Sequence, residues 1–582
     1  MSGSGFFVAD DKIPITQQSI GIPSENGLSY NSTQVIEIQV PPTTKFINPK
    51  ASCLQFNVKI KGDATAVGKT RLQLDSGIGA QVLIKDIRIY DGNRNTLLEE
   101  ITDYNTMVAM KYDYHSNKSL RNKRALTEGT ISENVASRGT RGSSVSDTDL
   151  VSNPYFKVKE GAQTTEWSDS DFLSAKVNLP LHTGLFQNDK ILPIMLLDGL
   201  HISITLEDNA RVFRQMDNVL LGRRTTYNPI FHSFNGSATD GEIKNGSATT
   251  TFFLQDENNM TNLSGANIIS CPFVVGEEIN LFNTTSAVTA SFTGPAYPKI
   301  VSISASEVGA VKFVVLTTQS VTNNSGVSLT TDGSWVIYSN SVKRAGSYEA
   351  TYQVSNVELV VQEVMMPSNY ESSMLSKMKE GGSLSYDFLS ATNYRYSQLA
   401  SDRVANIRIP INNTRCKSIL CVPTDANVYT QQQAIVGDSA TPTYKVFHDK
   451  TRDFRFHSGR SGLVGVADHI SSYNFVYDGR LQPSRVVSCS KTGNKVSISQ
   501  QALIELDKAL TSAGIETHSM KSYNENFIIG RALALGSGVY DASNKDFNLQ
   551  VNYQETNAPS VPKLWKNYVF HLRRLVIRGD TI

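Results

Sequence analysis

Runs in which apolar and polar side chains alternate with a period of two constrain this sequence more than any other feature. In one such run, Ile202, Ile204 and Leu206 alternate with Ser203 and Thr205. Because successive side chains of a β-strand point to opposite faces of a sheet, this run predicts a strand with one apolar face. Similar strand signals recur at residues 36–40, 54–60, 82–90, 352–366, 383–389, 405–411, 418–422, 473–477, 547–553 and 568–578.

Helical spacing is rare by comparison. It predicts an amphipathic helix near residues 97–112, a short helix that ends at Gly381-Gly382, and a helix at about 500–513. Ser499 is placed to cap the start of the last helix, and Gly514 lies just past its end. Since strands do not alternate with helices, a parallel α/β architecture is excluded, and many short strands with few helices indicate all-β sandwiches.

The length of 582 residues exceeds what one hydrophobic core usually supports. Each half of the chain shows strands, then one helix, then further strands, which predicts two sandwiches in tandem. We expect an N-terminal arm at residues 1–30, a first sandwich at 31–366 and a second at 367–582. The turn pairs Asp91-Gly92 and Asp478-Gly479 mark expected hairpins.

Residues 225–348 differ in composition, being rich in Asn, Ser, Thr and Gly. Short strands are still predicted there, so this region is interpreted as a β-rich insertion from a loop of the first sandwich. It holds Asn-x-Ser/Thr triplets at Asn235, Asn245, Asn259, Asn262, Asn283 and Asn323. They are either glycan acceptors or chance occurrences in an exposed region. A second polar stretch, residues 116–153, is predicted to be a long surface loop.

Charge and composition exclude several classes of protein. The formal net charge of +1 argues against a general nucleic-acid binder. No apolar run approaches the roughly 20 residues that span a bilayer, and the N-terminus lacks the pattern of a secretory signal. The odd number of dispersed cysteines, with only Cys416 and Cys421 close together, predicts reduced thiols rather than disulfides or a zinc site.

No reaction centre emerges from the sequence, so catalysis, a cofactor and a metal are not expected. Residues 62–70 look like a phosphate-binding loop, but five residues separate the glycines and no helix follows. His448 and His457 lack metalloprotease spacing. The basic tract 121–124 is either a protease site or a solvated charge cluster. Arg573, Arg574 and Arg578 are candidates for contact with DNA or for salt bridges between subunits.

Three segments carry a resemblance to a known family. Residues 176–208 form a strand–loop–strand unit with Pro180 and Pro193 at strand ends, residues 473–485 end in Pro-Ser-Arg, and residues 357–364 are followed by Gly-Gly-Ser-Leu-Ser-Tyr at 381–386. Together they resemble the double jelly-roll major capsid proteins of eukaryotic double-stranded DNA viruses of the Polinton-like, adintovirus and virophage type.

That resemblance implies two eight-stranded jelly rolls, with the 225–348 insertion as an outward tower. It also implies a homotrimer that forms a pseudo-hexameric capsomer and meets neighbouring capsomers, penton and minor capsid proteins. The implied location is the capsid of a virion assembled inside the host cell, around double-stranded DNA. Two alternatives remain: a secreted or surface β-sandwich adhesin that binds glycans, and a carbohydrate-active enzyme built on a jelly roll.

Overall fold

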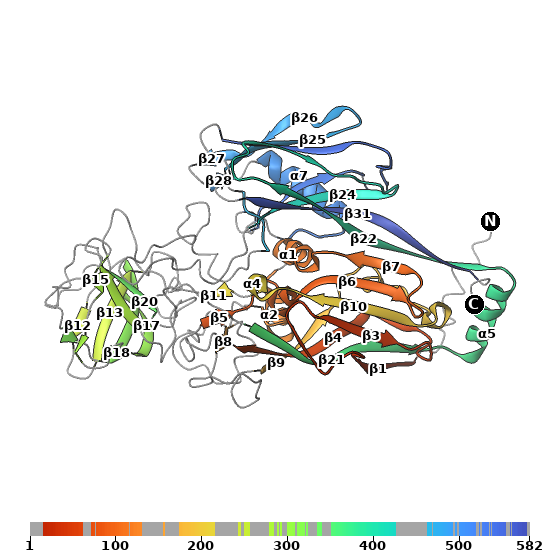
Figure 1. The fold of residues 1–582 in the computed structure, drawn as a ribbon, viewed down its shortest axis with the longest axis horizontal. Coiled ribbons are helices and arrows are strands. Elements are labelled where there is room, and N and C mark those ends of the chain that lie inside the picture. Colours follow the sequence, from red (N-terminus) through yellow and green to blue (C-terminus); the bar gives the residue numbers. More distant parts are fainter. Residues whose placement is uncertain are drawn as a thin grey trace.

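The structure is a computed structural model of the whole chain. It describes residues 16–61, 71–130, 155–157, 174–215, the strands between 243 and 339, and residues 351–426, 463–554 and 559–578, apart from short gaps within these ranges. Figure 1 shows two stacked β-sandwiches, called roll 1 and roll 2 below, and a separate group of strands at one end.

Roll 1 consists of a five-stranded layer and a four-stranded layer. The first layer has the order β1 (Thr16–Pro23), β21 (Thr351–Met365), β4 (Ile47–Lys61) and β9 (Ser174–Pro180), and β2 (Ser29–Asn31) also pairs with β21. The second layer has the order β3 (Val35–Val40), β10 (Leu200–Leu206), β6 (Ile84–Asp91) and β7 (Leu97–Ile101).

The alternation in the sequence sets the register of the second layer. Ile202 pairs with Ile38 on one side and with Ile89 on the other, and all three side chains are buried. A one-residue slip of any of these strands would turn its apolar set toward solvent, so the buried face fixes the pairing.

Roll 2 repeats this plan. Its first layer has the order β22 (Ser383–Gln398), β31 (Lys563–Arg578), β24 (Cys416–Asp425) and β29 (Ile529–Ala532). Its second layer has the order β23 (Val404–Arg408), β30 (Phe547–Tyr553), β25 (Ile470–Tyr477) and β26 (Arg480–Ser488).

The two rolls have the same connectivity. When the eight principal strands of each roll are numbered along the chain, the first layer is ordered 1-8-3-6 and the second 2-7-4-5 in both rolls. This is the jelly-roll arrangement of two interleaved Greek keys. The predicted fold class, two tandem eight-stranded jelly rolls, is therefore confirmed.

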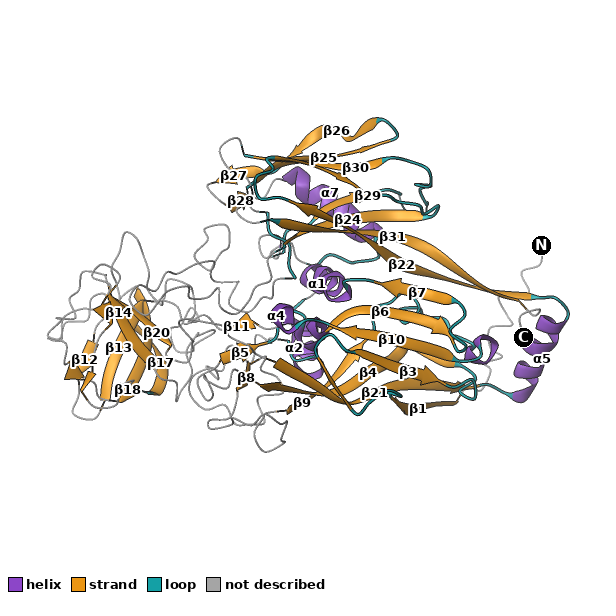
Figure 2. Cartoon of the chain, in the orientation of Figure 1, coloured by secondary structure: helices purple, strands orange, loops and turns teal. Residues whose placement is uncertain are grey.

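Helices α1 and α2 of roll 1 and helix α7 of roll 2 follow the same strand of their rolls. Between the fifth and sixth strands, roll 1 has α1 (Tyr104–His115) and α2 (Lys118–Thr127), and roll 2 has α7 (Gln500–Ser512). The linker between the rolls forms α5 (Ser368–Lys379), at the end of the molecule opposite the insertion (Figure 2). Short helical turns occur at η4 (Gly79–Leu83), η6 (Ile194–Leu197) and α4 (Asn209–Val212).

The insertion lies between the seventh and eighth strands of roll 1. Its main sheet has the order β12 (Ile243–Asn245), β13 (Thr249–Gln255), β18 (Val311–Gln319) and β17 (Ile300–Val308). A second sheet has the order β15 (Val288–Thr289), β14 (Ile279–Asn283) and β20 (Trp335–Ser339), and β16 (Phe292–Thr293) pairs with β19 (Thr322–Asn323). Asn235, Asn259 and Asn262 lie outside the described residues.

Three loops of roll 1 meet near the base of this insertion. They contribute β5 (Arg71–Gln73), β8 (Tyr155–Lys157) and β11 (Arg214–Gln215) to one small sheet. These loops follow the third, fifth and seventh strands of the roll, so they lie at the same end of the sandwich (Figure 1).

Several turns and helix ends agree with the sequence, while some boundaries differ. Asp478 and Gly479 both have positive φ angles, as a two-residue hairpin turn requires, and Gly381 and Gly514 have positive φ just beyond α5 and α7.

Residues 97–101 were expected to begin a helix but form β7, because they pair with β6. The predicted loop at 116–153 contains α2, whose first turn is capped by the Asn117 side chain.

Part of the segment expected to form an N-terminal arm, residues 1–30, is paired in the sheet. Residues 16–23 pair along their whole length with β21, and residues 29–31 pair with the same strand, so both segments belong to the first layer of roll 1. Most side chains of β1 are exposed, which explains why its sequence shows no apolar periodicity. The rest of the predicted arm, residues 1–15, lies outside the described residues.

Candidate functional site: the seam between the two rolls

Where roll 1 meets roll 2, one continuous segment of roll 1 supplies most of the specific contacts. This contact zone, called the seam below, is built around residues 99–115, which comprise the end of β7 and the whole of α1. Helix α1 lies between the two rolls in Figure 1, and ten of its twelve residues are buried. The helix was predicted to be amphipathic; it is buried on nearly all sides because roll 2 covers the face that would otherwise meet water.

A buried charge cluster occupies the middle of the seam. Asp103, between β7 and α1, lies 3.2 Å from Lys566 Nζ and 2.6 Å from Arg395 Nε, both of which belong to roll 2. Asn393 donates a further hydrogen bond to the same carboxylate at 2.8 Å. The side chain of Lys566 is fully buried and that of Asp103 is 4% exposed. Burial opposes ionisation of Asp103, but the positive charges of Lys566 and Arg395 outweigh it and hold the pKa of this carboxyl below its usual value.

Further hydrogen bonds hold Lys566 and the backbone of Asp103 in place. Lys566 Nζ donates to Thr106 Oγ1 at 2.7 Å, and Tyr568 Oη donates to the backbone carbonyl of Asp103 at 2.7 Å. A buried charge is stable only when its partners and hydrogen bonds are in place, so this cluster ties the relative position of the rolls to a defined geometry.

Glu99 forms a second bridge across the seam. Its carboxylate accepts hydrogen bonds from the backbone N–H groups of Gly184 and Leu185 in roll 1 and from Ser390 Oγ in β22 of roll 2, at 2.7–2.9 Å. Burial raises the pKa of Glu99 despite these donors. As expected for adjacent acids on a strand, the neighbouring Glu100 points the other way and pairs with Arg88 on the surface.

Backbone atoms of the rolls come unusually close beside this bridge. A Cβ atom at Gly184 would lie 2.3 Å from the carbonyl oxygen of Leu389 and 2.7 Å from the ring of Phe388. Real Cβ contacts are never that short, so glycine is required here for β22 to pack against roll 1.

The last turn of α1 is fixed by a loop of roll 2. Asn526 Nδ2 donates to Asp113 at 2.6 Å, and the hydroxyl of Tyr114 donates to the Asn526 carbonyl at 2.8 Å. The backbone N–H of His518 donates to the Tyr114 carbonyl at 2.9 Å. A helix end normally leaves its last carbonyls without partners, so roll 2 supplies part of the C-terminal cap of α1.

A buried polar cluster lies in roll 1 between α1 and α2. Tyr112 Oη contacts both Glu128 Oε2 and His182 Nε2 at 2.7 Å, and the Arg124 guanidinium stacks on the Tyr112 ring. Burial is the main reason that the pKa of Glu128 rises to about 7, and burial lowers the pKa of His182. Arg124, which belongs to the basic tract at residues 121–124, therefore packs against the ring of Tyr112.

The basic residues near the C-terminus make contacts within the chain. Arg574 forms two hydrogen bonds with Asp387 of the paired strand β22, at 2.8 and 2.9 Å, and Arg573 donates to the carbonyl of Leu97. The pKa of Asp387 is lowered to about 2 by the hydrogen bonds from Arg574 and Arg415. Neither DNA contact nor intersubunit pairing is needed to explain these two arginines.

The other candidates from the sequence contribute little chemistry. Cys416, Cys421 and Cys489 are buried free thiols, and burial raises the pKa of each one. Cys53 is a partly buried free thiol. His448, His457, Cys271 and the phosphate-loop-like segment 62–70 lie outside the described residues.

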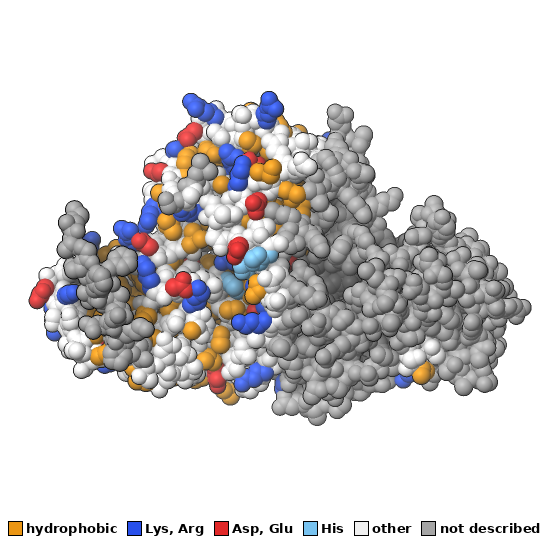
Figure 3. All heavy atoms as spheres, turned by 180° about the vertical axis from the view of Figure 1, so that it is seen from behind, with side chains coloured by type: hydrophobic (Ala, Val, Ile, Leu, Met, Phe, Trp, Pro, Cys, Tyr) orange, Lys and Arg blue, Asp and Glu red, His pale blue; other side chains and the backbone are white. Residues whose placement is uncertain are grey.

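The exposed surface is mixed in character. On the face in Figure 3, basic and acidic side chains are interspersed with apolar ones across the described part of the chain. Exposed apolar side chains include Leu481 and Val486 on the edge strand β26, and Ile504 on α7, which packs against β26. Among the described residues, none of the helices has the length and apolar character needed to cross a bilayer.

Comparisons with known proteins give structural likeness only. No protein-family model matches the sequence, and neither does any curated protein. The Faustovirus major capsid protein is similar at 10% identity and a TM-score of 0.45, over 98% of this chain and 91% of that one. PBCV-1 VP54, fitted into a reconstruction of the virophage Sputnik, has 10% identity and a TM-score of 0.42 over 97% and 95% of the two chains. The mavirus major capsid protein has 11% identity and a TM-score of 0.35 over 97% and 89%.

The strand orders 1-8-3-6 and 2-7-4-5, present in both rolls, decide the fold. This chain is a double jelly roll. The resemblance seen in the sequence to double jelly-roll major capsid proteins is thus confirmed at the level of the fold, and the two rolls of this double jelly roll are held together by the seam.

Proposed function

We propose that this double jelly roll is a major capsid protein whose trimers form the capsomers of an icosahedral viral shell. The observation that carries the proposal is that two rolls of identical connectivity are fixed side by side in one chain. Three such chains around a threefold axis present six similar rolls, which gives an outline close to a hexagon and suited to tiling. Jelly rolls occur in viral capsids, and also in lectins and cupins, so the repetition matters more than the single fold.

The seam supports this role. A shell subunit must transmit contacts from one neighbour to the next without hinge motion between its halves. The buried Asp103–Lys566 pair and the Glu99 bridge cross the boundary between the rolls. Because these groups lose their partners if the rolls separate, domain motion at the seam is costly.

The contact surfaces between subunits would lie on the flanks of the rolls. We assign one of them to β26, the outer edge of the second layer of roll 2, where Leu481 and Val486 are 46% and 50% exposed. An edge strand with exposed apolar side chains tends to associate with other chains, and a neighbouring subunit would cover it.

The domain division that goes with this function is an arm, a first roll ending near residue 366, and a second roll from 367 onward. The 225–348 insertion would project outward as a tower, away from α5. Neighbouring capsomers, penton and minor capsid proteins and the packaged DNA would be the partners in a virion assembled inside the host cell, and no catalytic role is proposed.

The test is the mass and outline of the purified full-length chain. Light scattering should give three times the chain mass of 63.9 kDa, and negative-stain images should show hexagonal particles. The Leu481→Lys/Val486→Lys variant should shift the protein toward monomers, whereas Val301→Lys, at an exposed position on insertion strand β17, should remain trimeric. Wild-type monomers that bind a glycan array would instead support the adhesin alternative.

A further inference from the structure

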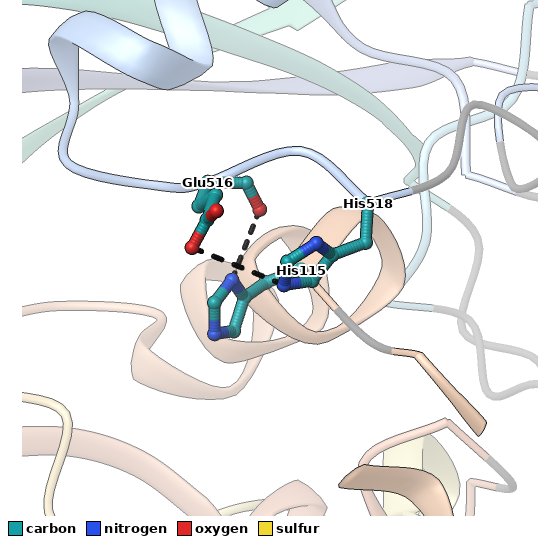
Figure 4. Close-up of side chains that lie close together, drawn as sticks. All are labelled: His115, Glu516 and His518. Carbon is teal, nitrogen blue, oxygen red and sulfur yellow. Dashed lines mark hydrogen bonds and ion pairs between the residues drawn. The ribbon is translucent and has the colours of Figure 1, made fainter. Parts of the chain in front are cut away.

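Two histidines and a glutamate converge where α1 ends against roll 2. His115 is the last residue of α1, and Glu516 and His518 lie in the roll 2 loop that follows α7 (Figure 4). One ligand atom from each residue, a ring nitrogen or a carboxylate oxygen, lies within 4.8 Å of the other two. The cluster therefore joins side chains that are about 400 residues apart in the sequence and belong to different rolls.

The backbone around the cluster is already positioned by the seam. His115 Nδ1 lies 3.0 Å from the Glu516 carbonyl oxygen, and the His518 N–H donates to the Tyr114 carbonyl. The two imidazole rings lie 4.9 Å apart between centroids, with 32° between their planes. His518 Nε2 is 4.0 Å from the Glu516 carboxylate. These contacts bring the three side chains together before any ligand is present.

The donor set suits a borderline divalent metal ion. Imidazole nitrogen and carboxylate oxygen are ligands of Zn²⁺, and two histidines with one glutamate is a set that leaves a fourth position for water. In a tetrahedral site, ligand atoms are about 3.3 Å apart, given metal–ligand distances near 2.0–2.1 Å. Ligand atoms that lie as far as 4.8 Å apart must therefore move closer together by up to roughly 1.5 Å when the metal binds. All three are at least partly exposed, so rotamer changes can supply this movement without disturbing the core.

The local electrostatics favour a cation at this point. The carboxylate of Glu516 supplies one negative charge, and the C-terminal end of the twelve-residue helix α1 supplies the negative end of its dipole.

We propose that His115, Glu516 and His518 bind a divalent transition metal, with Zn²⁺ the best fit, and that the ion ties α1 of roll 1 to the loop after α7 of roll 2. Because its ligands come from both rolls, the ion binds the assembled seam and not the separated rolls. Binding therefore stabilises the folded protein by mass action. This inference is independent of the capsid proposal, since it concerns only contacts within one chain.

The experiment uses the full-length chain after treatment with EDTA and dialysis. Titration with ZnCl₂ in a calorimeter should show one site per chain, and thermal unfolding should shift to higher temperature with added Zn²⁺. Co²⁺ should give the visible absorption of a four-coordinate site. His518→Ala should weaken Zn²⁺ binding about tenfold or more and abolish the thermal shift, and Glu516→Gln should do the same.

Both variants keep the seam intact in other respects, because His518 contacts Tyr114 and Glu516 contacts His115 through backbone atoms. Their unfolding temperatures in EDTA should match that of the wild type, which separates loss of the metal from loss of the fold. His201→Gln, at a histidine on β10 that pairs with Gln39, is the matched control and should bind Zn²⁺ like the wild type. Absence of Zn²⁺ binding by the wild type, or binding that persists unchanged in both ligand variants, would overturn the proposal.

Discussion

At the scale of single residues, the seam depends on a few buried charges. Asp103 and Lys566 form an ion pair that water scarcely reaches, while Arg408 and Asp546 form one with side chains 74% and 78% exposed. Taking charges out of water is expensive, so the loss of one member of a buried pair leaves an uncompensated charge. An exposed pair carries no such penalty because solvent replaces the missing partner.

We therefore predict that Lys566→Met lowers the free energy of unfolding by about 3 kcal/mol or more at pH 7. Arg395 remains within reach of Asp103, which places the loss toward the lower end of the range for buried pairs. The double variant Asp103→Asn/Lys566→Met should recover part of the loss, and Arg408→Ala should change stability by less than about 1 kcal/mol. Urea denaturation measures all three, and equal effects of Lys566→Met and Arg408→Ala would contradict a structural role for the buried pair.

Glu128 gives a prediction with a defined pH dependence. Burial raises its folded-state pKa to about 7, above the usual value for glutamate, so the folded state binds this proton more tightly than the unfolded state does. The resulting stabilisation is complete below about pH 4 and is lost as pH rises through 7. Relative to Glu128→Gln, the wild type should lose about 1–3 kcal/mol of stability between pH 4 and pH 8. Denaturation of the wild type and Glu128→Gln at several pH values tests this, and a stability difference between them that does not change with pH would contradict it.

At the scale of elements, close packing of β22 against the loop that holds Gly184 decides how near the rolls can approach. Gly184→Ala should cost about 1–3 kcal/mol, because the added methyl group would overlap the Leu389 carbonyl and either the loop or β22 must move. Gly21→Ala on the exposed strand β1 is the comparison, since the nearest atom there, at 3.2 Å, is the end of the Glu358 side chain. Differential scanning calorimetry compares the stability of the two variants. A Gly184→Ala protein as stable as Gly21→Ala would show that the seam tolerates a wider spacing between the loop and β22.

At the scale of the whole molecule, the apolar cores of the two rolls form one continuous cluster that includes α1. Rolls that share a core and a buried charge cluster should unfold together. Hydrogen exchange should therefore give the same opening free energy for the slowest amides of β4 in roll 1 and β31 in roll 2. Lys566→Met should lower both values together, whereas a selective loss in β31 would mean that the rolls are separate folding units.

The sequence by itself determined most of the strands and the turns between them. Alternation of apolar side chains identified β30 and β3 because burial on one face imposes a period of two, and Asp478-Gly479 marked a hairpin through its backbone preferences. These are local effects that do not depend on the rest of the chain. Cys416 and Cys421, expected to be reduced thiols, are free cysteines in the structure.

Only the tertiary structure decided how these elements combine. The spacing of Leu97 and Ile101 fits a helix as well as a strand, and pairing with β6 selected the strand. Helix α2 was missed because residues 118–127 carry few apolar side chains, and the Asn117 cap and the packing of Arg124 on Tyr112 help to hold it. The seam joins residues hundreds of positions apart, so no local pattern could reveal that Asp103, Glu99 and His115 would meet partners in roll 2. Their burial is a property of the assembled molecule, since it exists only once both rolls have closed over α1.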